Sequence, residues 1–159
     1  MSSDRGRAWA RMLIVCGLVV VADQATKGAI IETMASGERT DLALGVDLAR
    51  VTNSGIAFGL LDEGSDGAVL AVTIASLALV VGWFAFDPSR PGFWLGVGLL
   101  TGGACGNLAD RIRAGAVTDF LDPPLWPAFN LADVAITAGV IVIALAALAH
   151  PEPANAADS

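Results

Sequence analysis

The residues best able to do chemistry are the ionisable side chains that interrupt otherwise apolar stretches of the sequence. They are Asp23, Lys27, Asp110, Arg111 and Asp133. Ionisable groups are costly inside membrane helices, so they are functional candidates there by default. Two carboxylates that share a pocket of low dielectric cannot both ionise cheaply, so one would hold a proton. The charged one could take a proton from water and the protonated one could polarise a carbonyl, as in an aspartyl hydrolase.

Four apolar segments must position these side chains. Each is long enough to cross a bilayer, which takes about 20 mostly apolar residues per helix. We expect helices at about 11–34, 67–86, 93–112 and 131–149. The predicted fold is membrane all-α, a four-transmembrane-helix bundle that forms a single integral membrane domain over residues 1–150. The tail at 151–159 is small and polar, and we expect it to be disordered.

The connections between the helices differ in character. Residues 41–50 alternate between larger apolar and small or acidic side chains, and a period of two indicates a half-buried strand. We therefore expect a small β element outside the membrane at about 40–60. The segment 114–127 is expected to be a loop, stiffened by Pro123 and Pro124.

Successive crossings run in opposite directions, which decides where the two acids lie. The third helix ends at the face where the fourth begins, so Asp110 and Asp133 are expected at one depth, just inside one interface. Three of the four tryptophans fall at the other face, which suits the preference of tryptophan for membrane interfaces. Arginines outside the spans divide equally between the faces, but three of them precede the first helix and favour cytoplasmic termini.

Composition narrows the classes of function. The chain is 55% hydrophobic, its mean hydropathy is +0.66 and its net charge is −7, so it offers no basic surface for nucleic acid. A single histidine and two separated cysteines make no zinc-ligand cluster. We expect neither a metal nor an organic cofactor.

Each candidate residue also has a purely structural explanation. Asn130 lies three residues before Asp133, and this spacing is typical of an ordinary helix start. Asp23 and Lys27 are four residues apart, so they could neutralise each other on one helix face. Asp110 could be half of an interfacial ion pair.

Four stretches of the chain together resemble the signature segments of the lipoprotein signal peptidase (signal peptidase II) family. They are the D-Q-A-T-K at 23–27, the N-S-G-I-A-F-G at 53–59, the G-G-A-C-G-N-L-A-D-R at 102–111, and V-T-D-F at 117–120 with P-A-F-N-L-A-D at 127–133. Their order and spacing match the layout of four crossings over nearly the whole chain. One such stretch alone is weak evidence for the family, whereas all four in this order are specific to it.

The resemblance implies an activity and a set of site residues. The catalytic pair would be Asp110 and Asp133. The residues that line or support the site would be Asn53, Asn107, Arg111, Asn130, Asp23 and Lys27. The substrate would be a prolipoprotein that carries diacylglycerol on the cysteine of its lipobox, cut just before that cysteine. The enzyme would be a monomer among the lipids of the bacterial cytoplasmic membrane, with both termini cytoplasmic and its active site near the extracytoplasmic face.

Two other classes of function remain open from the residues alone. A small proton-coupled transporter would need an essential acid near a helix midpoint, reachable from both faces, and Asp23 comes nearest to that position. A non-catalytic membrane scaffold would rest on the glycine stripe Gly98, Gly102 and Gly106, whose spacing of four favours close helix packing. The scaffold leaves the two acids at the helix ends without a role.

Overall fold

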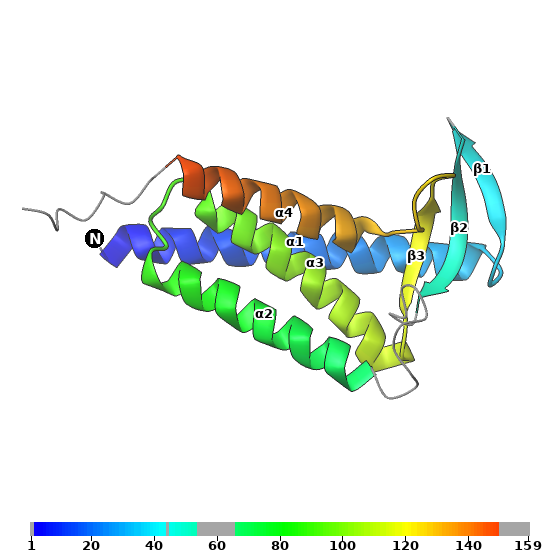
Figure 1. Ribbon diagram of the computed structural model, residues 1–159, viewed down its shortest axis with the longest axis horizontal. Coiled ribbons are helices and arrows are strands. Elements are labelled where there is room, and N and C mark those ends of the chain that lie inside the picture. Colours follow the sequence, from blue (N-terminus) through cyan, green and yellow to red (C-terminus); the bar gives the residue numbers. More distant parts are fainter. Residues whose placement is uncertain (1, 44, 54–65, 150–159) are drawn as a thin grey trace, which may run out of the picture.

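The computed structural model describes residues 2–43, 45–53 and 66–149, which form a helical bundle with a small sheet at one end (Figure 1). The helices are α1 (Ser2–Thr33), α2 (Asp66–Phe86), α3 (Phe93–Ala114) and α4 (Leu131–Leu148), and the strands are β1 (Arg39–Ala43), β2 (Val46–Asn53) and β3 (Val117–Asp122). The N-terminus, the α2–α3 connection and the end of α4 lie at the end away from the sheet. The predicted tail at 151–159 lies outside the described residues.

The helices follow the prediction closely, except that α1 begins at Ser2 rather than near residue 11. Its extra turns have a packing reason, because Ala8 is 7% exposed and belongs to a cluster with Met12, Phe84 and Phe93. The end of the bundle away from the sheet is therefore closed by aromatic side chains.

The outer surface of the bundle is apolar. By length and composition, α1 over Asp4–Thr33 and α4 over Leu131–Leu148 could each cross a membrane, and Leu70–Phe86 in α2 is a shorter apolar helix. Large apolar side chains face outward along three helices, such as Leu18 (65% exposed), Leu79 (75%) and Leu145 (61%). Charged side chains are buried instead, as Asp23 and Lys27 are. This inverted polarity suits a lipid environment.

The sheet corrects two predictions. The single strand expected at 41–50 is a hairpin, in which β1 pairs antiparallel with β2 and Gly45 adopts a φ of 78° at the turn. The loop expected at 114–127 contains β3, which pairs antiparallel with β2 and completes the sheet order β1-β2-β3. In V-T-D-F-L-D, Val117, Asp119 and Phe120 are buried and the other three side chains are partly buried, so the segment lacks the strict period of two that indicates a half-buried strand.

Glycines bring α3 close to both neighbouring helices. A Cβ atom at Gly102 would lie 2.7 Å from the Cβ of Val19, and one at Gly106 would lie 2.5 Å from an oxygen of Asp23. The predicted packing role of the glycine stripe is thus confirmed, and its partner is α1. On the other side of α3, Gly96 and Gly139 meet at the α4 contact. The close approach lets short side chains on three helices reach one another.

Candidate active site

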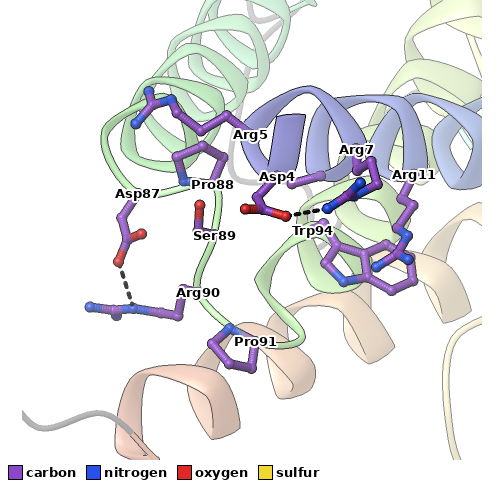
Figure 2. Close-up of a pocket in the computed structure, with 11 residues that line it drawn as sticks. Asp4, Arg5, Arg7, Arg11, Asp87, Pro88, Ser89, Arg90, Pro91 and Trp94 are labelled. Atoms are coloured by element: carbon purple, nitrogen blue, oxygen red, sulfur yellow. Dashed lines mark hydrogen bonds and ion pairs between the residues drawn. The ribbon is translucent and has the colours of Figure 1, made fainter. Parts of the chain in front are cut away.

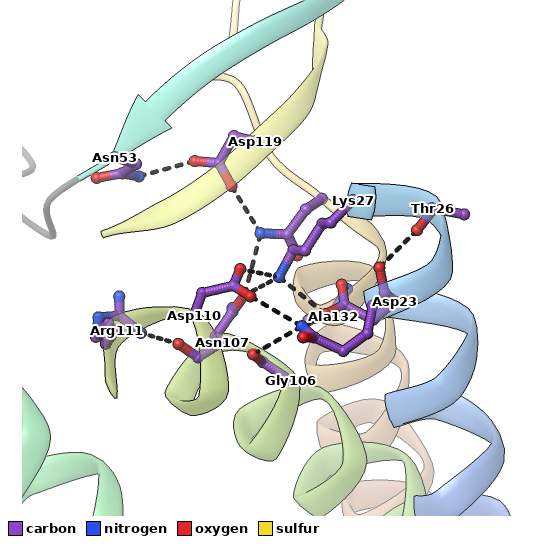
Figure 3. Close-up of polar contacts among 12 residues, drawn as sticks. Asp23, Thr26, Lys27, Asn53, Gly106, Asn107, Asp110, Arg111, Asp119 and Ala132 are labelled. Carbon is purple, nitrogen blue, oxygen red and sulfur yellow. Dashed lines mark hydrogen bonds and ion pairs between the residues drawn. The ribbon is translucent and has the colours of Figure 1, made fainter. Parts of the chain in front are cut away.

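The polar residues that sequence analysis singled out converge where α1, α3 and α4 meet the sheet (Figure 3). Lys27 is at the centre and is 2% exposed. Its ammonium nitrogen lies 2.8 Å from Asp23 Oδ2 and 2.8 Å from Asp110 Oδ2, and it donates to Asn107 Oδ1 at 2.9 Å. Lys27 therefore does neutralise Asp23, and it also pairs with Asp110 on α3.

Asp110 is held by α1 through both of its oxygens. While Oδ2 faces Lys27, Oδ1 accepts a hydrogen bond from Gln24 Nε2 at 2.8 Å. The oxygen of Gln24 in turn accepts from Arg113 at 2.7 Å. Asp110 thus forms an ion pair, but a largely buried one whose partner is a lysine from another helix.

Asp133 belongs to the capping box at the start of α4. Its backbone N–H donates to the Asn130 side chain and its own Oδ2 accepts from the Asn130 backbone, both at 3.1 Å. The other oxygen, Oδ1, accepts from Asn107 Nδ2 at 2.8 Å. The predicted cap is confirmed, and a helix N-terminus suits a negative charge. Asp23 is also tied to this helix, since its Oδ1 accepts from the backbone N–H of Ala132 at 2.9 Å.

Asp119, on β3, is an acid that sequence analysis quoted within a motif but did not select. It is 2% exposed, and its oxygens accept from Asn53 Nδ2 at 2.9 Å and from Asn130 Nδ2 at 2.7 Å. Burial raises its pKa, and the nearby Asp133 adds to that, although the two asparagines and Lys27 act in the opposite direction. Its presence in the V-T-D-F stretch at 117–120 was the signal that could have identified it.

Asn130 joins the two acids that lack a direct lysine partner. Its amide nitrogen donates to Asp119 Oδ1 and its amide oxygen accepts from the Asp133 backbone. Asp110, by contrast, is connected to Asp133 through Lys27 and Asn107. The geometry therefore groups Asp119 with Asp133, and Asp110 with Asp23 and Lys27.

Arg111 is at the edge of this network. Its Nη1 lies 3.4 Å from the backbone oxygen of Asn107. Its Nε is buried, and among the described residues no acceptor is within hydrogen-bond reach of it. Of the motif at 53–59, Asn53 joins the network, whereas residues 54–59 lie outside the described residues.

Two hollows flank the acids. An apolar groove of about 450 Å³ runs along α4 beside Asp133, between Trp126 and Ile141. A second, more polar hollow of about 250 Å³ is lined by Lys27, Asp110 and Thr118, among others. An extended polypeptide or an acyl chain can thus approach Asp133 from the apolar side of the bundle.

Comparisons with known proteins agree on one family. Residues 15–149 match the family described as signal peptidase (SPase) II. A lipoprotein signal peptidase from Pelotomaculum thermopropionicum is 42% identical over 138 residues, which cover 86% of this chain and 91% of that protein. One from Syntrophotalea carbinolica is 41% identical, covering 85% and 89%.

Solved structures point the same way. A structure described as a bacterial membrane enzyme, determined by the in meso method at 2.3 Å resolution, superposes with a TM-score of 0.79. It is 30% identical in sequence and the match covers 93% of each chain. The buried acids, the helical bundle with its end sheet, and these relatives lead to one conclusion: the chain belongs to the signal peptidase II family.

Proposed function

We propose that this chain, a protease of the signal peptidase II family, removes signal peptides from diacylglyceryl-modified prolipoproteins by cutting before the lipidated cysteine. The relatives at about 40% identity are lipoprotein signal peptidases, and they match along most of the chain. The comparisons do not support the transporter alternative. Buried acids at one end of an apolar bundle suit a substrate that is itself held by the membrane.

The proposed arrangement in the membrane has all four helices crossing. The outward-facing apolar side chains of α2 support a crossing there, and the buried, glycine-rich α3 is enclosed by α1 and α4. The termini would be cytoplasmic, with the acids and the sheet near the extracytoplasmic face. The chain would act as a monomer surrounded by lipid.

The proposed reacting acids are Asp133 and Asp119. The single observation that carries this assignment is the side chain of Asn130, which bonds to both residues within 3.1 Å. The sequence favoured Asp110 as the second catalytic acid beside Asp133, and that pairing stays a prediction. Both oxygens of Asp110 already contact Lys27 and Gln24, so we assign it to positioning Lys27 instead.

The chemistry needs a proton acceptor and a proton donor on opposite sides of one peptide bond. Asp133 accepts a proton from water as the water oxygen attacks the carbonyl carbon before the lipidated cysteine. Asp119, whose raised pKa favours its protonated form, gives its proton to the carbonyl oxygen, so that a tetrahedral gem-diol forms. As the C–N bond breaks, Asp133 passes the proton taken from water to the leaving amine, and Asp119 recovers its proton from a hydroxyl of the gem-diol. The products are the free signal peptide and a mature lipoprotein with a new amino terminus.

The remaining polar residues have proposed roles around this pair. Asn107 and Asn130 hold the acids in place through their side-chain amides. Asn53 and Arg111 would bind the backbone of the extended substrate, and the buried Nε of Arg111 is a donor suited to a substrate carbonyl. The apolar groove beside Asp133 would accept an apolar part of the substrate.

A cleavage assay in detergent tests the proposal, with a diacylated prolipoprotein beside its unlipidated form. Asp133→Asn and Asp119→Asn should each lower turnover by about 10²–10⁴-fold, the contribution typical of general acid–base catalysis. Asp110→Asn should lower it less, and part of that loss should accompany a lower melting temperature. Equal cutting of the unlipidated form would refute the substrate class.

The same assay separates the two candidate pairs. Thermal unfolding and the binding of an uncleavable lipidated peptide show whether each variant is folded. If folded Asp119→Asn kept its turnover while folded Asp110→Asn lost it, the reacting pair would be Asp110 and Asp133. If folded Asp133→Asn remained active, the two-acid mechanism would be wrong for this chain.

A further inference from the structure

A second charged region lies at the end of the bundle away from the sheet. A cavity of about 630 Å³ opens between the first turns of α1 and the connection from α2 to α3 (Figure 2). Arginines dominate its lining: Arg5, Arg7 and Arg11 come from α1 and Arg90 from the connection. The peptidase chemistry proposed above uses none of these residues.

Two of the four arginines are neutralised within the cavity and two are not. Arg7 pairs with Asp4, and Arg90 lies 3.6 Å from Asp87. Arg5 donates to the backbone oxygen of Ala85 at 2.8 Å instead. Neither Arg5 nor Arg11 has an ion-pair partner in the part of the chain that the structure describes. The cavity therefore has a net positive charge.

The unpaired arginines are held in place by neutral groups. The guanidinium of Arg11 lies over the ring of Trp94, 5.6 Å from its centroid. The bond from Arg5 to Ala85 fixes the other guanidinium across the gap between α1 and α2. A guanidinium fixed in this way still has donors for an oxyanion, and less side-chain entropy is lost when the anion binds.

Aromatic and apolar side chains place the cavity at the level of lipid headgroups. Trp9 packs against Phe84 and Trp83 against Phe93, so tryptophans ring this end of the bundle. Phe86, which precedes the cavity-lining Asp87 in the chain, is 84% exposed. A ligand here would contact arginine at one end and an apolar, lipid-facing helix surface at the other.

We infer that this cavity binds the phosphate of an anionic glycerophospholipid. The inference rests on the membrane arrangement proposed above, but not on the peptidase activity. A phosphate oxyanion matches the two unpaired guanidinium groups, and acyl chains match the exposed apolar surface next to them. Free phosphate shares the headgroup chemistry but gains nothing from that surface, and a zwitterionic lipid brings a cation into an already positive cavity.

Native mass spectrometry of the whole chain in non-ionic detergent measures lipid binding and so tests the inference. The probes are phosphatidylglycerol, phosphatidylcholine with the same acyl chains, and inorganic phosphate. Phosphatidylglycerol should bind at least about fivefold more tightly than phosphatidylcholine, and Arg5→Gln and Arg11→Gln should each weaken it about fivefold, as expected for one arginine beside an anionic lipid. Arg11→Lys, which keeps the charge, should lose less than Arg11→Gln.

Arg39→Gln provides the matched control, because Arg39 is 59% exposed at the sheet end and pairs with Asp122. It removes the same charge and should leave phosphatidylglycerol binding unchanged, and none of the arginine variants should lower turnover in phosphatidylcholine. Equal binding of the two lipids, or an equal loss in the control, would overturn the inference. Inorganic phosphate bound as tightly as the lipid would overturn the lipid as the ligand.

Discussion

The two ends of the bundle use charge in opposite ways. At the sheet end, the charged side chains of the acid network are buried and come from distant parts of the chain, as Lys27 and Asp110 do. At the other end they are exposed and pair with near neighbours, as Arg7 does with Asp4 three residues away. The buried pairs hold the helices in a single geometry. The exposed pairs neutralise charge between residues close in sequence and leave other arginines available to a ligand.

Burial decides how much each arrangement contributes to the free energy of folding. A charge removed from water needs partners on every side, so deleting one member leaves the others unsatisfied. An exposed pair loses little when it is broken, because water and salt replace the partner. The sheet end should therefore be sensitive to single substitutions and the arginine end tolerant of them.

The largest expected effect comes from Lys27→Met, a substitution of similar length without charge. Lys27 contacts two carboxylates at 2.8 Å, so its loss leaves Asp23 and Asp110 buried without their cation. We expect unfolding to become easier by about 3–5 kcal/mol, the range for breaking a buried pair, and peptidase activity to be lost. Denaturation by sodium dodecyl sulfate, followed by tryptophan fluorescence, measures the change.

Arg7→Gln is the counterpart at the other end. Arg7 is 64% exposed and its partner Asp4 is 59% exposed, so the expected change is below about 1 kcal/mol, with activity unaffected. Similar losses of stability in the two variants would show that the contrast between the ends is wrong.

Asn130 offers a finer test, because it caps α4 and also bonds to Asp119. Serine keeps the cap but cannot reach Asp119 with an amide, whereas alanine loses both functions. Asn130→Ser should retain most of the stability, and Asn130→Ala should lose about 1 kcal/mol more, a typical value for a missing N-cap. Melting temperatures of the two variants, measured side by side, give the difference.

The same pair of variants reports on the acids. The hydrogen bond from Asn130 lowers the pKa of Asp119, so its removal should raise that pKa further. If Asp119 acts in its protonated form, the alkaline limb of the pH–rate profile should move to higher pH in Asn130→Ser. A limb that stayed in place would argue against Asp119 as the proton donor.

Sequence was a good guide to the helices and a poor one to the sheet. Long apolar stretches predict helices almost without tertiary information, and the three later helices begin within one residue of expectation. The strands depend on pairing with partners far along the chain, such as Asn53 opposite Val117. A short segment like β3 has too few residues to reveal its partner and no strict alternation of buried side chains, so it was predicted to be a loop.

The site shows the same limit. Residue type and membrane cost identified Asp23, Lys27, Asp110 and Asp133, and the structure brings all of them into one network. The grouping within that network could not be predicted, because it depends on which oxygen faces which donor. Asp119 escaped selection since it lies outside the apolar segments, where an acid has no evident cost.

A gain of stability is expected on removing the charge of Asp119. Its folded-state pKa is raised above its ordinary value of 3.8 by burial, so the folded protein holds this proton more tightly than the unfolded chain. The stability that it contributes is therefore complete below pH about 4 and is lost as pH rises through the folded-state pKa. Asp119→Asn removes that loss, so the variant should turn over far more slowly than wild type yet melt at a higher temperature at pH 7. The difference should shrink towards pH 4, because wild-type Asp119 then also becomes neutral. A melting temperature of Asp119→Asn that fell below wild type at neutral pH would mean that this acid is buried at no cost, and the contrast between the two ends would then rest on Lys27 alone.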